Sequence, residues 1–471
     1  MKQAITLTSH RPPRRISVLG GLCFATALGV FAAGRSFTPY ASVKPILEAQ
    51  SQQLPAALRS ATESEWLSWV RQQDKAIRAR LLQGDLDSMV NLLLSGTSFT
   101  SRPRIPMEDL TAASRSGLLR SRVDDLVAGV RSPGSNQRLL FLQRLLRDQG
   151  IDPASPDGPA ETGRFILQNL LRVAEERRAL AERAAADEKT LAHPNDTASL
   201  LDRESLFYDR GVSLDTGIFP DYTLQQTLAD LKRRGELRVG QVSRVAVIGP
   251  GLDFIDKNEE SAFDYYPQQT LQPFALYDSL LRTGLAPQSV SLSLFDISAR
   301  VIDHIRRARE QARKNNGYVV QLPRDVSRPW PSGLVAYWQS LGDRVGTAVA
   351  PIPPPEIFPG LETRAVRIRP DVVLACEPVD LNIVVERLNL AATDRFDLIV
   401  GTNIFVYYDA FEQALALENV AAMLKPGGLL LTNDRLPEVT GGSIRLAGVT
   451  VVPYDSPGVN ARQAMGWYRR Q

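Results

Sequence analysis

The second half of the chain alternates between short apolar runs and helical stretches, and this alternation limits the folds that it can adopt. After Leu237 the apolar runs are short and rich in β-branched residues, as in Arg244–Ile248 and Phe396–Val400. Helical spacing of apolar residues fills the segments between the runs. Parallel strands need long crossover connections, which helices usually provide. The second half is therefore expected to be an α/β domain with a mostly parallel sheet.

The expected elements of this domain follow from where each pattern begins and ends. Strands are expected at residues 244–248, 290–295, 372–375, 396–400 and 429–431. Helices are expected at residues 268–282, 298–315 and 410–424. The last two apolar runs, at residues 449–453 and 463–468, predict an antiparallel pair at the end of the sheet. The fold class is thus a Rossmann-like sheet, mostly parallel with an antiparallel end.

The first half has a different residue composition and pattern, which predict an all-helical domain before the α/β domain. Tyrosine is absent between Tyr40 and Tyr208, and β-branched runs are rare. Thr62 and Glu65 have the spacing of a capping box, in which each side chain satisfies a free backbone amide at a helix start. The expected division is a leader at residues 1–34, a helical domain at 42–200, a connector at 201–236 and the α/β domain at 237–471.

The leader combines a basic start with an uncharged, mostly apolar run at residues 16–33. This layout is typical of a signal peptide, and small residues near its end suit a cleavage site. Eighteen residues also lie at the short end of a membrane-spanning helix, so a retained anchor stays open. Either reading predicts a cell-envelope location, exported or attached to the membrane through residues 16–33. If the leader is not functional, the protein is expected in the cytoplasm.

Composition excludes several classes of protein. Of 471 residues only two are cysteine and three are histidine, so neither a disulfide framework nor a Cys/His zinc site is expected, and no metal site is predicted. The net charge is only +3, and the average share of hydrophobic residues, 44%, excludes a disordered chain and a polytopic membrane protein. The modest charge also disfavours nucleic acid as a partner.

Unusual residues follow the expected strands at the edge where open α/β sheets bind ligands. Gly249 and Gly251 come directly after the first strand, and glycine lets a ligand approach the backbone closely. Asp296 ends the second strand, where a carboxylate can accept both hydroxyls of a ribose. Two plainer readings stay open from these residues alone. The glycines suit a packed turn, and the aspartate suits a cap of the following helix.

Two later segments make the pattern more specific. The run FDLIVGTNIFVYYD at residues 396–409 and the run LKPGGLLL at residues 424–431 follow the glycine turn and Asp296 in order. Together these motifs resemble class I S-adenosylmethionine-dependent methyltransferases. The nearest variety is the chemotaxis-receptor type, which has an Asn and an aromatic pair after its fourth strand. The resemblance covers residues 237–471 and leaves the helical half unassigned.

The resemblance implies S-adenosylmethionine as cofactor and a role for each matched residue. Gly249 and Gly251 would lie against its methionine part, and Asn403 with Ile404 beside the sulfonium. The adenosine contacts would be Asp296 at the ribose, Ile297 at the adenine, and Asp380 with Leu381 near the adenine amine. Asn403, Tyr407 and Tyr408 would be the catalytic candidates, the two tyrosines near the incoming substrate. A sulfonium is a cation, so aromatic faces near it are physically reasonable, but packing beneath the loop stays an open reading for both tyrosines.

The chain departs from the family pattern in three places. The usual third glycine of the first motif is missing, with Leu252 and Asp253 in that region. An insertion at residues 253–267 predicts either a lid or a packed surface loop. A second insertion, at residues 321–361, predicts a substrate flap or a brace against the helical half.

The leading hypothesis is a methyltransferase acting on a protein side chain or a small molecule. The alternative is an inactive methyltransferase-fold protein of the cell envelope with a binding or structural role, because an exported enzyme would be separated from a cytoplasmic cofactor. A nicotinamide-dependent oxidoreductase is disfavoured by the missing third glycine. The methyl acceptor and the oligomeric state are not encoded in any pattern that we can read.

Overall fold

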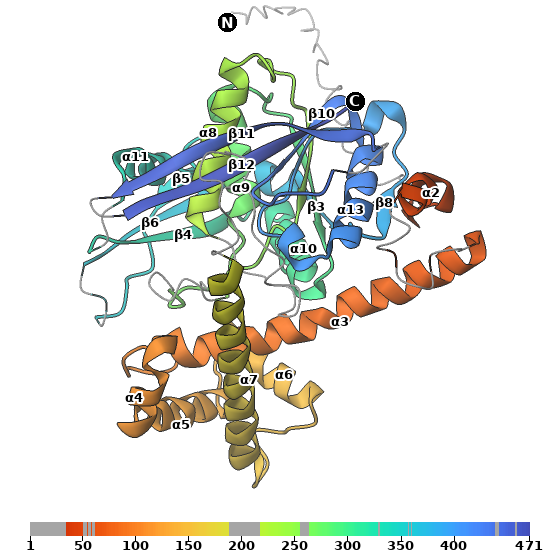
Figure 1. Ribbon diagram of the computed structural model, residues 1–471. Coiled ribbons are helices and arrows are strands. Elements are labelled where there is room, and N and C mark those ends of the chain that lie inside the picture. The colour runs from red at the N-terminus through yellow and green to blue at the C-terminus, as the bar shows by residue number, and fades with distance from the viewer. Residues whose placement is uncertain are drawn as a thin grey trace, which may run out of the picture.

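The computed structural model describes residues 34–49, 54, 58, 62–187, 217–254, 263–327, 330–356, 358, 360–438, 442–456 and 459–471. A large sheet with its helices occupies one half of the molecule, and a group of helices lies below it in Figure 1. The apolar run at residues 16–33 lies outside the described residues. Within the described ranges, no helix combines the length and the apolar character that a membrane span requires.

Seven strands form the central sheet, in the order β11-β12-β10-β9-β2-β3-β7. The bounds are β2 Arg244–Ile248, β3 Ser291–Asp296, β7 Cys376–Asp380, β9 Phe396–Val400, β10 Leu424–Thr432, β11 Ile444–Ser456 and β12 Val459–Arg470. The pairs from β7 to β10 are parallel, and β12 is antiparallel to both β10 and β11. The sheet is thus a Rossmann-like, mostly parallel sheet with an antiparallel end, as the sequence predicts for a class I methyltransferase fold.

One expected strand is wrong. Residues 372–375 were expected in a strand, but Pro370–Leu374 form a short helix, α12, and the strand β7 begins at Cys376. Pro370 stands at the start of the helix, where its missing N–H costs nothing, and Asp371 favours the first turn. Val372 and Val373 are both buried in the core. Their apolar pattern therefore reflects burial rather than a strand.

Alternation along the strands divides the core into two layers. Val245 and Val247 face a core formed with α8 (Ile218–Arg233), α9 (Gln272–Thr283) and α10 (Ala299–Arg313). Ala246 and Ile248 face the opposite core, formed with α2 (Tyr40–Ala49), the start of α3 (Glu63–Ser95) and α13 (Ala410–Met423). This is the period of two that a strand buried on both faces requires. Near the second layer, β1 (Arg35–Phe37) pairs with β8 (Glu386–Leu388).

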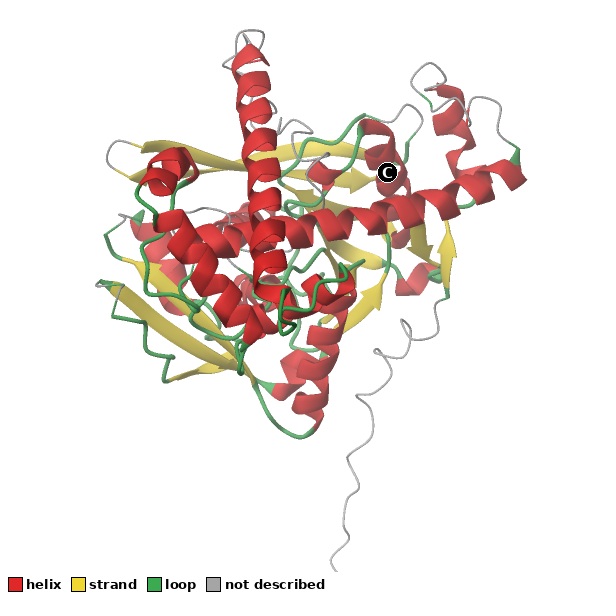
Figure 2. Cartoon of the chain, turned by 90° about the horizontal axis from the view of Figure 1, so that it is seen from below, coloured by secondary structure: helices red, strands yellow, loops and turns green. Residues whose placement is uncertain are grey.

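The remaining helices form a separate module with its own core. It contains the C-terminal part of α3, with η2 (Met107–Asp109), α4 (Leu110–Arg115), α5 (Leu118–Arg131), α6 (Gln137–Asp148) and α7 (Gly158–Asp187). The capping box of Thr62 and Glu65 is confirmed at the start of α3. This helix of 33 residues runs below the sheet and into the module, as Figures 1 and 2 show. We keep the four-part division as a prediction, and note that α2, α3 and α8 pack on the sheet across its boundaries.

The second insertion folds as a small antiparallel sheet beside the main one. Its strands are β4 (Tyr318–Asp325), β5 (Gly346–Val349) and β6 (Leu361–Ile368), in the order β4-β6-β5, and α11 (Ser332–Ser340) lies between β4 and β5 in sequence. Gln269 and Gln321 exchange two hydrogen bonds of 2.8 and 2.7 Å that tie β4 to the segment before α9. The small sheet shares the core of α8 and α9, so it extends the α/β domain.

Candidate functional site

The chain reverses its direction of travel along the sheet at β2, which lies between β3 and β9. In open α/β sheets this reversal leaves a crevice beyond the carboxyl ends of the strands, and ligands bind there. Gly249, Asp296 and Asn403 stand at or just after the ends of these three strands. The fold therefore brings the sequence-predicted residues to one edge. The η6 turn (Phe405–Tyr407) follows β9 at the same edge.

The glycine turn after β2 has the backbone that only glycine adopts without strain. Gly249 has a φ of 65° and Gly251 a φ of 72°. The Gly249 amide donates to the carbonyl of Phe295 at 2.8 Å. A Cβ added to Gly249 would lie 2.1 Å from Cδ1 of Ile404. The close approach predicted for this glycine is made by the Ile404 side chain of the chain itself.

Asp296 combines a structural bond with an unusual electrostatic setting. Its carboxylate accepts the backbone amide of Ser298 at 2.8 Å, just before α10, and its side chain is buried. Burial raises the pKa of Asp296 to about 7, and the nearby carboxylate of Asp380 adds to the increase. Asp296 pairs in register with Asp380 on β7. The carboxylate of Asp296 therefore caps the start of α10, as the plainer interpretation predicts. Its other lone pairs could still accept hydrogen bonds from a ribose.

Asp380 is held by arginines from two distant segments. Its Oδ1 lies 2.8 Å from Nη1 of Arg78 on α3, and its Oδ2 lies 3.6 Å from Nη1 of Arg35. Arg78 also donates to Asp74 at 2.9 Å and to the carbonyl of Ile297 at 3.3 Å. The neighbouring Leu381 is buried, and its amide donates to the carbonyl of Asp296. The residues expected around the adenine are therefore linked to one another, and Arg78 bridges them.

Asn403 has a left-handed backbone with a φ of 57°, a conformation that asparagine tolerates better than most residues. Its amide donates to Oδ1 of Asn433 at 2.8 Å, and Nδ2 of Asn433 donates back to Oδ1 of Asn403 at 2.8 Å. The next contact follows the same pattern, with the amide of Phe405 donating to Asp434 at 3.1 Å. Two residues beyond β10 thus hold the loop after β9, a link that the sequence patterns did not indicate.

Tyr407 and Tyr408 are both buried, at 6% and 4% exposure. Tyr407 packs with Val406, Leu81 and Ile297. Tyr408 lies in the core that contains α13, and burial raises the pKa of its phenol, so that the hydroxyl keeps its proton. The two side chains thus pack beneath the loop. Their predicted place near a substrate stays a prediction.

The helix α3 covers this edge of the sheet and is fastened at several points. Arg80 lies 2.7 Å from Oε1 of Glu412, a carboxylate that is 1% exposed on α13. The indole of Trp66 donates to the carbonyl of Thr38 at 2.7 Å. Asp85 lies 3.4 Å from Arg300 on α10. Sequence reasoning missed this role of α3, because the partners are hundreds of residues away. The only local signal in the described part of the helix is a set of basic residues in its N-terminal part.

The described ends of the first insertion join the helical module to the sheet. Phe254 is fully buried in the core of the module, with its ring 5.3 Å from that of Phe141. The buried Arg138 donates to the carbonyls of Phe254 and Tyr266. Asp264 accepts the amide of Thr97 at 3.0 Å. These ends are packed rather than lid-like, and residues 255–262 lie outside the described residues.

Comparisons with known proteins give similarities of fold alone. No family model and no curated protein sequence matches the chain. Among solved structures, it is similar to TrmN from Thermus thermophilus, with 11% identity and a TM-score of 0.24 over 54% of this chain. That match spans about half of TrmN, 52% of its length.

Two further similar structures are methyltransferases of small molecules by their names. Magnesium protoporphyrin IX methyltransferase from Synechocystis PCC 6803, with bound SAM, shares 10% identity over 57% of this chain and 85% of its own, with a TM-score of 0.26. Mitomycin 7-O-methyltransferase shares 12% identity over 77% of this chain and 98% of its own, with a TM-score of 0.27. The class of fold stated above rests on the strand order of this chain.

Proposed function

We propose that this protein is an S-adenosylmethionine-dependent methyltransferase whose cofactor site lies beyond the carboxyl ends of β2, β3 and β9. The observation that carries the proposal is the convergence of a left-handed glycine turn, a buried carboxylate and a left-handed asparagine at the reversal point of the sheet. Each of these follows a different strand, so the fold rather than the local sequence brings Gly249, Asp296 and Asn403 together.

The residue types at this edge suit the cofactor, while the space beside them is filled by side chains. Asp296 offers carboxylate oxygens for ribose hydroxyls, and Gly249 keeps its backbone open to close approach. Ile404 lies over Gly249, and Leu81 packs against the pair of Val406 and Tyr407. The conformation described here is therefore a closed one. Binding of the cofactor requires rotation of Ile404 and a shift of Leu81 away from the edge.

The bound cofactor would supply an activated methyl group on a sulfonium, and the chain would supply position and electrostatics. Methyl transfer is an in-line displacement that gains most from orientation of the two reactants. We assign Asp296 to the ribose, Asp380 and Leu381 to the adenine, and Asn403 to the floor beside the reacting centre. Tyr407 and Tyr408 would border the site on the side from which the substrate approaches. Burial raises the pKa of Tyr408 and keeps its phenol protonated, so Tyr408 is not assigned as a base.

Calorimetry with S-adenosylhomocysteine and the full-length chain tests the proposal. Val43, Trp66 and Ile77 belong to the core on one face of the sheet, so a fragment that begins at residue 237 would expose that core. We expect one site in the wild type and a loss of at least about tenfold in affinity in Asp296→Ala, since one good charge-assisted contact is worth about 1.4 kcal/mol or more. Asp303→Ala, an exposed carboxylate on α10, should bind as the wild type does. No binding by the wild type at millimolar ligand would favour the inactive alternative.

The acceptor and the location are finer proposals that rest on the sequence. The resemblance to the chemotaxis-receptor type favours a carboxylate acceptor on a protein, by analogy only. The leader favours the cell envelope, with residues 16–33 as a signal or an anchor. A fusion of the N-terminus to a reporter that is active in only one compartment tests the location. Reporter activity in the cytoplasm alone would overturn the envelope proposal.

A further inference from the structure

A cavity of about 880 Å³ lies where the helical module, α10 and the small sheet meet. Its lining contains none of the residues assigned to the cofactor, although Leu252 directly follows the glycine turn. Its walls come from α6, from α10 and from the strands β4 to β6. Clefts between packed units are common places for ligands. Four arginines line this one, namely Arg144, Arg300, Arg307 and Arg367, whereas no carboxylate of the described residues does.

Three of these arginines have no carboxylate to neutralise them. Within the described part of the chain, Arg144, Arg307 and Arg367 take part in no salt bridge, although most arginines in the same region are paired. All three are exposed and come from α6, α10 and β6. Positive charges gathered on one cavity repel one another, so this lining costs free energy in the absence of an anion. Arg300 differs, because it lies 3.4 Å from Asp85.

Neutral donors complete the lining. Nε2 of Gln268 is buried, faces no hydrogen-bond acceptor and belongs to a side chain of the same cavity wall. A buried donor without an acceptor is costly, and a bound acceptor would satisfy it. Nε2 of His304 lies 2.8 Å from the hydroxyl of Tyr318, which accepts the amide of Thr270 at 2.8 Å. Burial and the positive charges of Arg307 and Arg300 lower the pKa of His304 to about 4, so its ring is neutral at pH 7.

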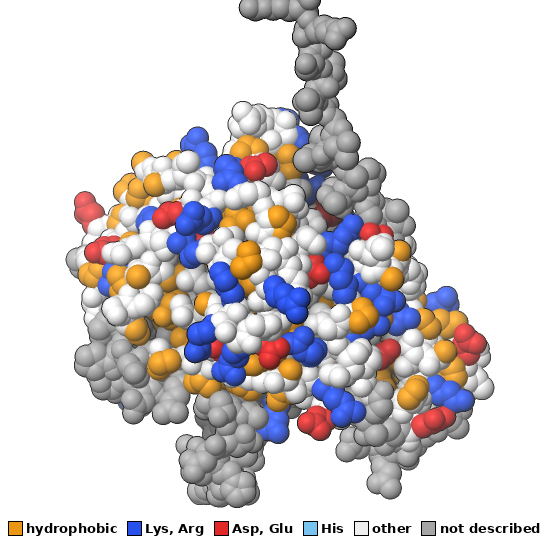
Figure 3. Space-filling model, turned by 90° about the horizontal axis from the view of Figure 1, so that it is seen from above, with side chains coloured by type: hydrophobic (Ala, Val, Ile, Leu, Met, Phe, Trp, Pro, Cys, Tyr) orange, Lys and Arg blue, Asp and Glu red, His pale blue; other side chains and the backbone are white. Residues whose placement is uncertain are grey.

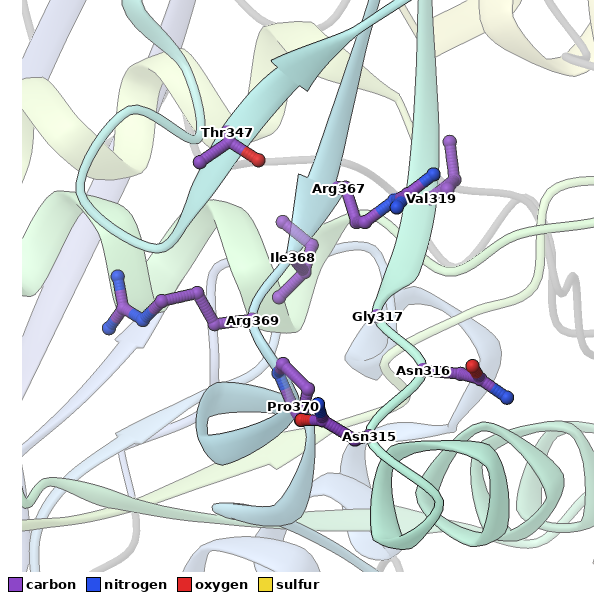
Figure 4. A pocket seen from close by; sticks show the side chains of 9 residues that line it. All are labelled: Asn315, Asn316, Gly317, Val319, Thr347, Arg367, Ile368, Arg369 and Pro370. Carbon is purple, nitrogen blue, oxygen red and sulfur yellow. The ribbon is translucent and has the colours of Figure 1, made fainter.

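The position of Arg367 is built into the small sheet. A Cβ at Gly317 would lie 2.6 Å from both Cγ of Arg367 and the carbonyl oxygen of Ile368. The absence of a side chain at Gly317 thus lets the stem of Arg367 cross the start of β4. Figure 4 shows the guanidinium of Arg367 beside Val319, whereas Arg369 points the opposite way. Arg367 also borders the smaller pocket of about 450 Å³ drawn there. Arg369, which lines that smaller pocket, is paired with Asp371.

The face seen in Figure 3 does not share this single sign of charge. On the face seen in Figure 3, basic, acidic and hydrophobic side chains are interspersed. A mixed surface is the ordinary state of a globular protein. The cavity therefore stands out by its lining, with four arginines, an unsatisfied amide donor and no carboxylate among the described residues.

We propose that this cavity binds a small organic polyanion that carries two or more phosphate groups. Arginine suits phosphate because its planar fork donates two parallel hydrogen bonds, and three unpaired arginines match more than one phosphate. Gln268 would donate its free N–H to the same ligand. The proposal holds whether or not the other edge binds S-adenosylmethionine, since the two sites use different side chains.

Pyrophosphate is the probe, titrated by calorimetry into the full-length chain at constant ionic strength, with inorganic phosphate in parallel. We expect one site for pyrophosphate, tighter binding than for inorganic phosphate, and at least about a tenfold loss in the triple variant R144Q/R307Q/R367Q. The variant R71Q/R115Q/R238Q is the matched control, because it removes the same charge from exposed arginines outside the cavity. It should bind within about twofold of the wild type, as surface charges beyond a Debye length are largely screened.

A second readout reports the place of binding. The ring signals of His304, assigned by their loss in His304→Gln, should shift with pyrophosphate at pH 7 in the wild type and in the control. Arg307→Gln alone, a change at an exposed position, keeps the test valid if the triple variant loses its fold. The proposal is overturned if pyrophosphate at about 10 mM shows no binding. The dissociation constant would then exceed about 10 mM, and the binding free energy would be smaller than about 3 kcal/mol. It is also overturned if both triple variants lose affinity equally, which would indicate attraction by net charge alone.

Discussion

At the scale of single residues, Gly249 and Asp296 each have a structural role in addition to the proposed ligand contact. Gly249 makes room for Ile404, and Asp296 holds the turn into α10. The sequence predicted both positions as special, because glycine and aspartate at strand ends are uncommon outside turns, caps and ligand sites. It did not predict which neighbour would approach them, because Ile404 lies 155 positions away from Gly249 and only folding brings the two together.

Gly249→Ala tests the structural role of Gly249, which is to leave space for Ile404. A left-handed backbone costs about 1–2 kcal/mol for alanine, and the overlap with Ile404 adds about 1–3 kcal/mol for an overpacked core. Gly427→Ala is the matched control, since Gly427 has a φ of 75° with nothing within 4 Å of an added Cβ. Urea unfolding should show the larger loss at Gly249. Equal losses of unfolding free energy at the two positions would mean that the Ile404 side chain moves aside without destabilising the fold.

Asp296→Asn tests the electrostatic setting through pH. Because the folded-state pKa of about 7 exceeds the ordinary value of 3.8, ionisation opposes folding and stability falls as pH rises between these values. Asparagine keeps an acceptor for Ser298 and cannot ionise. Thermal unfolding at pH 8 should show the variant more stable than the wild type, on the order of 1–3 kcal/mol, and the gain should vanish below pH 4. A gain that does not change with pH would contradict the raised pKa, and Asp303→Asn controls for net charge.

At the scale of elements, strands proved more predictable than the helix that covers them. Runs such as Arg244–Ile248 can be recognised in the sequence, because a strand that is buried on both faces is continuously apolar. The apolar residues of α12 imitate that signal over a few positions, which is too short a window to separate a strand from a buried helix. The path of α3 across the sheet depends on ion pairs such as Arg78 with Asp380, which link segments about 300 residues apart. No local pattern encodes such a pair.

Arg80→Met tests the attachment of α3 to α13. It leaves the carboxylate of Glu412 buried without its arginine, and breaking a buried pair in this way costs about 3–5 kcal/mol. Arg71→Met, at an exposed position of the same helix, should change the free energy of unfolding by less than about 0.5 kcal/mol. Both values come from urea unfolding. A similar small change in both variants would show that the pair does not hold the helix.

At the scale of the whole molecule, the helical module has its own core and is linked to the α/β domain by several contacts. Phe254 leaves the glycine turn and ends in the core of the module, and α3 belongs to both. Sequence reasoning separated the two halves by composition, which records what each half is made of and not how they pack. The mostly parallel sheet with its antiparallel end and the candidate edge followed from the sequence, whereas the strand order and the closed state of that edge required the structure.

Phe254→Ala tests this coupling. Removal of a fully buried ring should cost about 3–5 kcal/mol, and hydrogen exchange should rise in α5 and α6 as well as around β2. Leu171→Ala, at a largely exposed position of α7, should leave exchange in both regions unchanged. Faster exchange confined to one of the two regions would contradict a shared core.

The central claim is that the edge beyond β2, β3 and β9 is the cofactor site, closed in the conformation described here by Ile404 and Leu81. A crystal structure of the full-length chain grown with saturating S-adenosylhomocysteine tests it most directly. We predict that the ribose hydroxyls lie within hydrogen-bond distance of Asp296, and that the side chains of Ile404 and Leu81 have moved away from Gly249 and from Val406 and Tyr407. A ligand bound elsewhere, or an edge that stays closed with no ligand at saturating concentration, would contradict the claim.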